Sequence, residues 1–130
     1  DNKLVITKTQ QIIDAPRIDV MDMQGDTIVV GGNKMERFGQ VWVYRQKGKE
    51  EQWKEEKTWV KHSSVDFGNT IAVHNDWLFV GDLSPKPRVH VYKYSSSWGG
   101  KWTLQQELSG HGSRYSWFSA DIKVLADDLV

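Results

Sequence analysis

The sequence predicts an all-β fold of repeated four-stranded antiparallel units, and three observations lead to this prediction. A glycine- and aspartate-led run of branched apolar residues at 25–31 returns at 75–81 and starts again at 126–130. A second landmark, Val41–Tyr44, returns as Val89–Tyr92. No stretch of the chain shows sustained helical periodicity. A recurring spacing of about 50 residues indicates stacked supersecondary units rather than one irregular fold.

Each unit contains four segments of strand character. In the first unit, residues 21–24 alternate apolar and polar and run into a tight polar turn. The next two segments, 27–30 and 41–44, are apolar on both faces, which is typical of strands covered by two other layers. The fourth, 53–60, is charged and alternating, as expected of an outer edge strand. Its tryptophans and Thr58 favour a strand over a helix.

Two apolar middle strands and one charged outer strand describe a blade of a β-propeller, in which each blade is covered by its neighbours. We expect the end of a preceding blade at 1–17, blades at 18–66 and 67–117, and the start of a further blade at 118–130. A closed propeller usually needs four to eight blades. About two and a half blades therefore predict a partial propeller, completed by further blades of a longer protein or by copies of the chain.

The bulk composition excludes some function classes. The 130 residues carry 17 basic and 17 acidic side chains, so the formal net charge is zero, whereas a general nucleic-acid binder would show a basic excess. No apolar run is long enough for a transmembrane helix, so we expect no membrane insertion. Cysteine is absent, which leaves the cellular compartment open.

The second unit, Phe67–Gly81, resembles the FG-GAP or integrin-alpha-like propeller repeat. In that repeat a Phe-Gly opens the first strand, a Gly-Asp turn follows, and the next strand ends in Val-Gly. Gly39–Tyr44 and Trp53 supply its later Gly-x-Val-x-Val-Tyr strand and its tryptophan-led outer strand. The resemblance implies a propeller fold and a place outside the cell or on its surface.

The chain also departs from that family. Arg17-Ile18 and Phe118-Ser119 stand where Phe-Gly is expected, and Gly31-Gly32 replaces the Ala-Pro pair. The turn around Asp26 is too short for the Asp-rich calcium loop of integrin-type repeats, so calcium binding is not expected. A kelch-type propeller is the alternative, because Gly31-Gly32, Tyr44 and Trp53 follow the kelch order of landmarks.

Candidate sites are few. The hairpin aspartates Asp26, Asp76 and Asp127 are expected to bond the local backbone, and Glu55-Glu56 is expected to form a solvated rim. We predict that most tryptophans pack between blades, and that loop residues bind a partner. No metal or other cofactor is expected, because His62, His74, His90 and His111 lack metal-ligand spacing. The predicted partner-binding residues are Lys34, Met35, Glu36, Arg37, Lys86, Trp98, Tyr115 and Trp117.

No nucleophile, phosphate loop or placed pair of acids indicates an enzyme. We therefore expect a non-enzymatic binding or adhesion module whose loops contact a protein or a glycan. Two alternatives remain open at this stage. One is a glycan-binding lectin, and the other is a structural subunit whose blades pair between chains to build a ring or filament.

Overall fold

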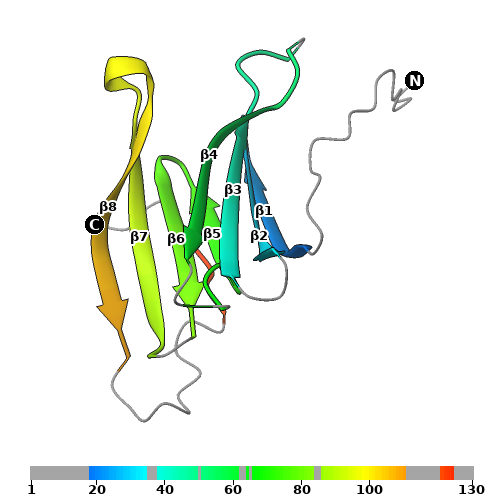
Figure 1. Cartoon of the computed structure of the whole chain (residues 1–130). Coiled ribbons are helices and arrows are strands. Elements are labelled where there is room, and N and C mark those ends of the chain that lie inside the picture. Colours follow the sequence, from blue (N-terminus) through cyan, green and yellow to red (C-terminus); the bar gives the residue numbers. More distant parts are fainter. Residues whose placement is uncertain are drawn as a thin grey trace, which may run out of the picture.

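The computed structural model describes residues 18–34, 38–49, 51–61, 64, 66–83, 86–110 and 121–124. The described residues form two four-stranded antiparallel sheets, whose arrangement can be followed in Figure 1. In the described part of the chain there is no α-helix, and a single 3₁₀ turn, η1 (Ser97–Gly99), interrupts the loop between the last two strands. The expected all-β architecture of four-stranded antiparallel units is confirmed.

Sheet 1 contains β1 (Ile18–Gln24), β2 (Thr27–Lys34), β3 (Phe38–Arg45) and β4 (Lys54–Lys61), in that spatial order. Sheet 2 contains β5 (Ile71–His74), β6 (Trp77–Asp82), β7 (Arg88–Ser95) and β8 (Lys101–Ser109), again in chain order. Within each sheet, therefore, the strands that pair are consecutive in sequence. The charged segment that follows Trp53 forms the edge strand β4, as its alternating pattern predicts.

The two sheets repeat each other in register. Ile28 lies opposite Tyr44 in sheet 1, and Leu78 lies opposite Tyr92 in sheet 2. The pairing of β3 with β4 shifts register between Val43 and Tyr44, so that Glu56 is an extra residue in β4, and the pairing of β7 with β8 shifts in the same way, so that Gln105 is an extra residue in β8. A bulge adds one residue to a strand and bends it. Because the same irregularity occurs in both sheets, the repeat seen in the sequence is also a repeat of backbone geometry.

The first hairpin of each sheet turns in the same way. Gly25 has a φ of 57° and Asn75 has a φ of 51°. Left-handed backbone is typical of the two-residue turns that suit twisted hairpins, and glycine and asparagine are the residues that adopt it most readily. The sequence therefore uses different residue types to build one turn.

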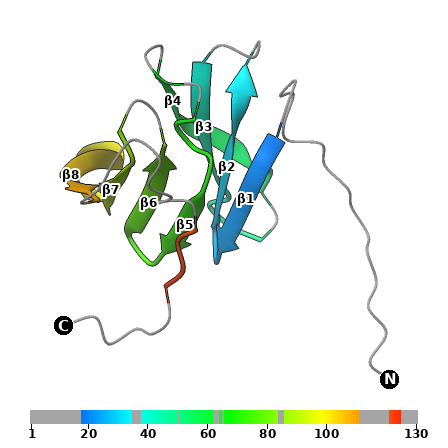
Figure 2. The same ribbon diagram turned by 90° about the horizontal axis from the view of Figure 1, so that it is seen from below.

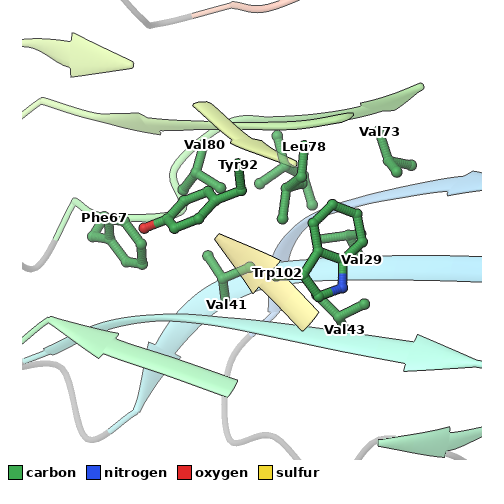
Figure 3. Packing of buried hydrophobic residues seen from close by; sticks show 10 residues of the cluster. Val29, Val41, Val43, Phe67, Val73, Leu78, Val80, Tyr92 and Trp102 are labelled. Carbon is green, nitrogen blue, oxygen red and sulfur yellow. The ribbon is translucent and has the colours of Figure 1, made fainter. Parts of the chain in front are cut away.

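The sheets meet through opposite faces. We call the face of sheet 1 that carries Val29, Val41 and Val43 its forward face, and the opposite face its rear face. In sheet 2 the rear face carries Leu78, Val80 and Tyr92, and the forward face carries Phe79 and Val91. The forward face of sheet 1 and the rear face of sheet 2 share one core, which Figure 3 shows from close by. Burial of each such side chain stabilises the fold by about 1.5–3 kcal/mol.

The connector between the sheets seals this core. A β-carbon added at Gly31 would lie 2.1 Å from the Gly68 carbonyl oxygen, and one added at Gly39 would lie 2.4 Å from that of Phe67. Gly68 has a φ of 85°, which favours glycine. The phenylalanine ring itself is buried in the core. The Phe67-Gly68 pair thus allows the connector to pack closely onto the glycines of the preceding sheet.

The predicted packing of tryptophans between successive units is found for Trp59 and Trp102. Trp102 is buried in the shared core, and Trp59 packs against Tyr92 with ring centroids 4.7 Å apart. Trp42 is buried with Tyr44 on the rear face of sheet 1, where Trp53 partly covers them. Trp77 is only half-buried, on the forward face of sheet 2.

The innermost strands lie side by side. Figure 2 shows β1 and β5 next to each other, with residues 121–124 beyond β5. Asp22 of β1 accepts a hydrogen bond of 2.8 Å from the backbone N–H of Val73 in β5. Gln24 Oε1 accepts from the N–H of Asn75, and Gln24 Nε2 lies 3.2 Å from His74 Nδ1. Polar contacts thus fasten the inner strands, while apolar contacts hold the rest of the interface.

Candidate binding surfaces at the two ends of the sheets

The loops gather at two ends of the antiparallel sheets. The β3–β4 and β7–β8 loops lie at one end, which we call the hairpin end because the turns at Gly25 and Asn75 also lie there. The β2–β3 and β6–β7 loops lie at the other, the connector end, with the segment that joins the sheets. Figure 1 shows the hairpin end at the top.

The predicted binding residues divide between these ends. Lys34 ends β2 at the connector end, where Lys86 is exposed. Trp98 lies in η1 at the hairpin end, and only its backbone is described. The remaining five predicted residues lie outside the described residues, namely Met35, Glu36, Arg37, Tyr115 and Trp117. Lys86 and Trp98 therefore belong to different surfaces of the molecule.

An ionic network joins the two sheets at the hairpin end. Arg45 of β3 donates from Nε to Glu56 Oε2 at 2.6 Å and from Nη1 to Asp26 Oδ1 at 3.1 Å. Its guanidinium lies 4.1 Å from the centre of the Tyr94 ring in sheet 2. Trp102 of sheet 2 donates from Nε1 to Glu56 Oε1 at 2.8 Å. Arg45 and Glu56 therefore link side chains of both sheets.

Burial lowers the pKa of Arg45, but the hydrogen bond and charge of Glu56 and the charge of Asp26 raise it more, so its net pKa shift is upward. The network corrects two expectations. Glu56 does not belong to a solvated rim, because its side chain is 20% exposed and bonded to both sheets. Asp26 pairs with Arg45, where a bond to its own backbone was expected.

A pocket of about 240 Å³ lies beside this network. It lies where the β3–β4 loop of sheet 1 meets Tyr94 and Gly99 of sheet 2. The loop contributes Lys47 and Glu51, and the start of β4 contributes Lys54 and Glu55. The pocket thus offers charges of both signs and an aromatic ring. This combination fits polar recognition better than burial of an apolar ligand.

The connector end holds a chain of buried polar groups. Asp82 is fully buried, and its Oδ1 accepts a hydrogen bond of 2.6 Å from Ser64 Oγ in the connector. His90 Nε2 lies 3.4 Å from Asp82 Oδ2, and His90 Nδ1 lies 3.1 Å from Glu107 Oε1. The ring of Phe67 meets the His90 ring edge-on at 5.3 Å.

Although serine, aspartate and histidine all occur in this chain of groups, they are not arranged for nucleophilic catalysis. A catalytic serine is activated by a hydrogen bond to its base. Here the Ser64 hydroxyl donates to the carboxylate of Asp82, and the imidazole contacts carboxylates on both sides. The arrangement satisfies a buried carboxylate and ties the connector to sheet 2.

A second pocket, of about 410 Å³, lies at the inner edge of the sheets. Three segments line it, namely 21–22 of β1, 71–74 of β5 and 122–124. They occupy equivalent positions in three successive repeats of the sequence. Asp22, His74 and Lys123 give the pocket its polar side chains.

Two further classes of site have no support in the part of the chain that the structure describes. Among those residues, no group of three or more histidine, cysteine, aspartate or glutamate side chains could hold a metal ion. None of their helical turns has the length and apolar character needed to cross a membrane.

Sequence reasoning missed the polar residues that organise both ends. Arg45 follows the apolar strand 41–44 without a motif of its own. The sequence did contain a sign that Asp82 is unusual, because this charged residue follows a buried strand directly, at the position that Gly32 holds in the first repeat. An unpaired carboxylate there would be costly. That cost predicts a partner such as His90.

Comparison of the chain with protein-family models, curated proteins and solved structures finds no match.

Proposed function

We propose that the two sheets are successive blades of a propeller-type scaffold of the FG-GAP kind, and that the protein is a non-enzymatic binding module of the cell surface or extracellular space. The pocket between the β3–β4 and β7–β8 loops carries this proposal. Loops held by a rigid scaffold are the usual place for binding residues. The kelch-type propeller is the alternative scaffold, and it would place the same loops at the same end.

Three features of the packing support a propeller-type arrangement. The sheets contact each other through opposite faces, as successive blades do. Their inner strands lie together with polar contacts between them. The pocket at the inner edge is lined by three equivalent segments, as the central channel of a propeller would be.

The chemistry of the hairpin-end pocket favours a protein partner over a glycan. Lys47, Lys54, Glu51 and Glu55 present both signs of charge within one small region. Such a surface fits a partner of complementary charge pattern, and charge complementarity sets specificity and association rate. A sugar would depend on Tyr94 and on the Trp98 turn, since rings stack on aromatic side chains.

Charge reversal at the pocket tests this proposal. The chain is applied to an array of secreted and cell-surface proteins and to a glycan array. We expect binding to at least one arrayed protein, and we expect the double variant Lys47→Glu, Lys54→Glu to weaken it at least tenfold. Lys86→Glu is the matched control, because it reverses a charge at the connector end and should leave binding unchanged.

Each other outcome contradicts part of the proposal. Binding to glycans alone would favour the lectin. An equal loss of binding in the control variant Lys86→Glu would indicate that the binding site lies at the connector end. The absence of binding on both arrays would contradict the proposed binding function. A chemical change in a bound partner, measured by mass spectrometry, would contradict the proposal that the protein is not an enzyme.

A further inference from the structure

The inner strands of the two sheets meet through side chains that reach backbone groups. β5 is an edge strand of sheet 2, so the backbone groups on its open side find their partners outside the sheet. Asp22 of β1 supplies one partner, because its Oδ2 accepts a hydrogen bond of 2.8 Å from the N–H of Val73. Gln24 supplies another, because its Oε1 accepts from the N–H of Asn75. We call this contact between β1 and β5 the first junction.

The same arrangement changes one repeat further on. Residues 121–124 lie beyond β5, as Figure 2 shows, and we call the region between them and β5 the second junction. The strand register places Ala72 where sheet 1 has Asp22, and the sequence repeat places Val124 where β5 has Val73. An alanine side chain has no hydrogen-bond acceptor. The N–H of Val124 therefore has no counterpart of the carboxylate that Asp22 gives to Val73.

The polar side chains that the second junction contributes to its pocket are hydrogen-bond donors. Gln24 Nε2 lies 3.2 Å from His74 Nδ1, and an amide nitrogen can only donate, so Nδ1 accepts and the proton of the neutral ring lies on Nε2. Lys123 Nζ lies 3.3 Å from Asp121 Oδ2, but both side chains are exposed. Exposed ion pairs of this kind are weak. The Lys123 ammonium is therefore able to pair with another anion.

The pocket of about 410 Å³ at the inner edge of the sheets includes this second junction. A pocket of this size accommodates a small organic molecule. On its β1 side lies the Asp22 carboxylate, which already accepts hydrogen bonds of 2.9 and 2.8 Å from the N–H groups of Met23 and Val73. The negative charge of Asp22 opposes a second anion on that side. An anionic group is therefore favoured on the opposite side, beside Lys123.

We propose that this pocket binds a small organic acid. The carboxylate of the ligand takes, one repeat further on, the place that the Asp22 carboxylate has at the first junction. It accepts from the N–H of Val124 and pairs with Lys123, while the apolar body of the ligand contacts Ile122. Hydrogen bonds to a charged group are stronger than those between neutral groups, so the carboxylate decides the class of ligand. This site is separate from the hairpin-end pocket and adds a second ligand to the proposed binding function.

Titration of the full chain followed by nuclear magnetic resonance tests the proposal. The probes are benzoate and butyrate, each compared with its primary amide, which keeps the shape of the acid and removes its charge. We expect both acids to shift the backbone amide signals of Lys123 and Val124 in a saturable way at millimolar concentration. The two amides should bind at least tenfold more weakly. The signals of Lys47 and Lys54 at the hairpin end should not move.

Two variants assign the binding to this pocket. Lys123→Gln removes the ammonium group and should weaken benzoate binding about fivefold. Lys86→Gln is the matched control, because it removes the charge of an exposed lysine at the connector end and should leave binding unchanged. Ala72→Asp supplies within the chain the carboxylate that sheet 1 has at Asp22, and it should prevent benzoate from binding. Since Ala72 is buried, circular dichroism checks that this variant folds, and the Lys123→Gln result decides if it does not.

Several outcomes would overturn the inference. One is that neither acid shifts the Val124 signal, and another is that the amides bind as tightly as the acids. A third is that Lys123→Gln binds benzoate as well as the wild type does. Binding of trialanine with a free carboxyl terminus, without binding of either small acid, would identify the ligand as a peptide terminus instead. None of these outcomes affects the array test at Lys47 and Lys54, so failure here is distinguishable from failure of the proposed function.

Discussion

The rear face of sheet 2 and the rear face of sheet 1 have nearly the same pattern and different surroundings. In sheet 2 the first-strand positions Ile71 and Val73 are buried, and in sheet 1 the equivalent Met21 and Met23 are exposed. The middle strands of both sheets are apolar. The comparison teaches that the repeat dictates which positions share a face of a sheet, whereas contact with the neighbouring sheet dictates whether the first-strand positions of that face are buried.

The largest expected effect is the difference in stability between the variants Leu78→Ala and Ile28→Ala. Leu78 is fully buried between the sheets, so its truncation should lower the free energy of unfolding by about 3–4 kcal/mol. Ile28 lies beside exposed methionines, and its truncation should cost about 2 kcal/mol because that site can relax. Urea denaturation of both variants measures the difference. Equal losses would mean that the rear face of sheet 1 is as tightly packed as the interface.

The two tyrosines at equivalent positions in the sheets, Tyr44 and Tyr92, give a pH-dependent test. Burial raises the pKa of Tyr92 to about 12, with smaller contributions from Glu107 and Asp82. Burial, followed by the charge of Glu55, also raises the pKa of Tyr44. Because the folded state holds the phenolic proton more tightly than the unfolded state, this stabilisation is fully present below pH 10 and is lost as the pH rises toward 12.

Two units of pKa correspond to about 2–3 kcal/mol. Denaturation between pH 9 and 12 should therefore show a steep fall in stability for the wild type. Tyr92→Phe should make the curve shallower by that amount, since phenylalanine has no proton to lose. A curve of unchanged slope in Tyr92→Phe would contradict the assignment of the titration to this residue.

The smallest expected effect compares the cations at equivalent positions. Arg45 binds Glu56, Asp26 and the Tyr94 ring, so Arg45→Met should cost about 2 kcal/mol by leaving Glu56 with fewer partners. Lys93 is exposed beside Trp77, and Lys93→Met should change stability by less than about 0.5 kcal/mol. Thermal unfolding at neutral pH measures both. A loss in Lys93→Met as large as that in Arg45→Met would contradict this difference between the two cations.

Much of the fold could be predicted because its determinants are local. Alternation, turn residues and the recurrence of Val41–Tyr44 as Val89–Tyr92 each depend on a few neighbouring residues. The polar network could not be predicted, since Arg45, Glu56 and Trp102 meet only after two sheets have packed. A charge pattern such as Glu55-Glu56 does not show which carboxylate faces the interface, because that depends on the bulge in β4 that makes Glu56 an extra residue.

The candidate site, like the fold, could be predicted only in part. Loops between strands were predicted to carry binding residues, and Trp98 does lie in the turn beside the hairpin-end pocket. Lys86 and Trp98 lie at opposite ends of sheet 2 because they flank the two ends of β7. The meeting of the β3–β4 loop with the β7–β8 loop, in contrast, depends on how the two sheets stack. The buried partners of Asp82 belong to separate elements that no local pattern connects.

The order of pairing within each sheet also bears on how the chain folds during synthesis. Each strand of sheet 1 pairs only with a strand next to it in sequence, so the sheet requires no residue beyond Lys61 to complete its hydrogen bonding. Such local topology forms quickly. A growing chain can therefore finish sheet 1 first and present Val29 and Val41 as a template on which the later strands assemble, with the Phe67-Gly68 connector as the first part to arrive.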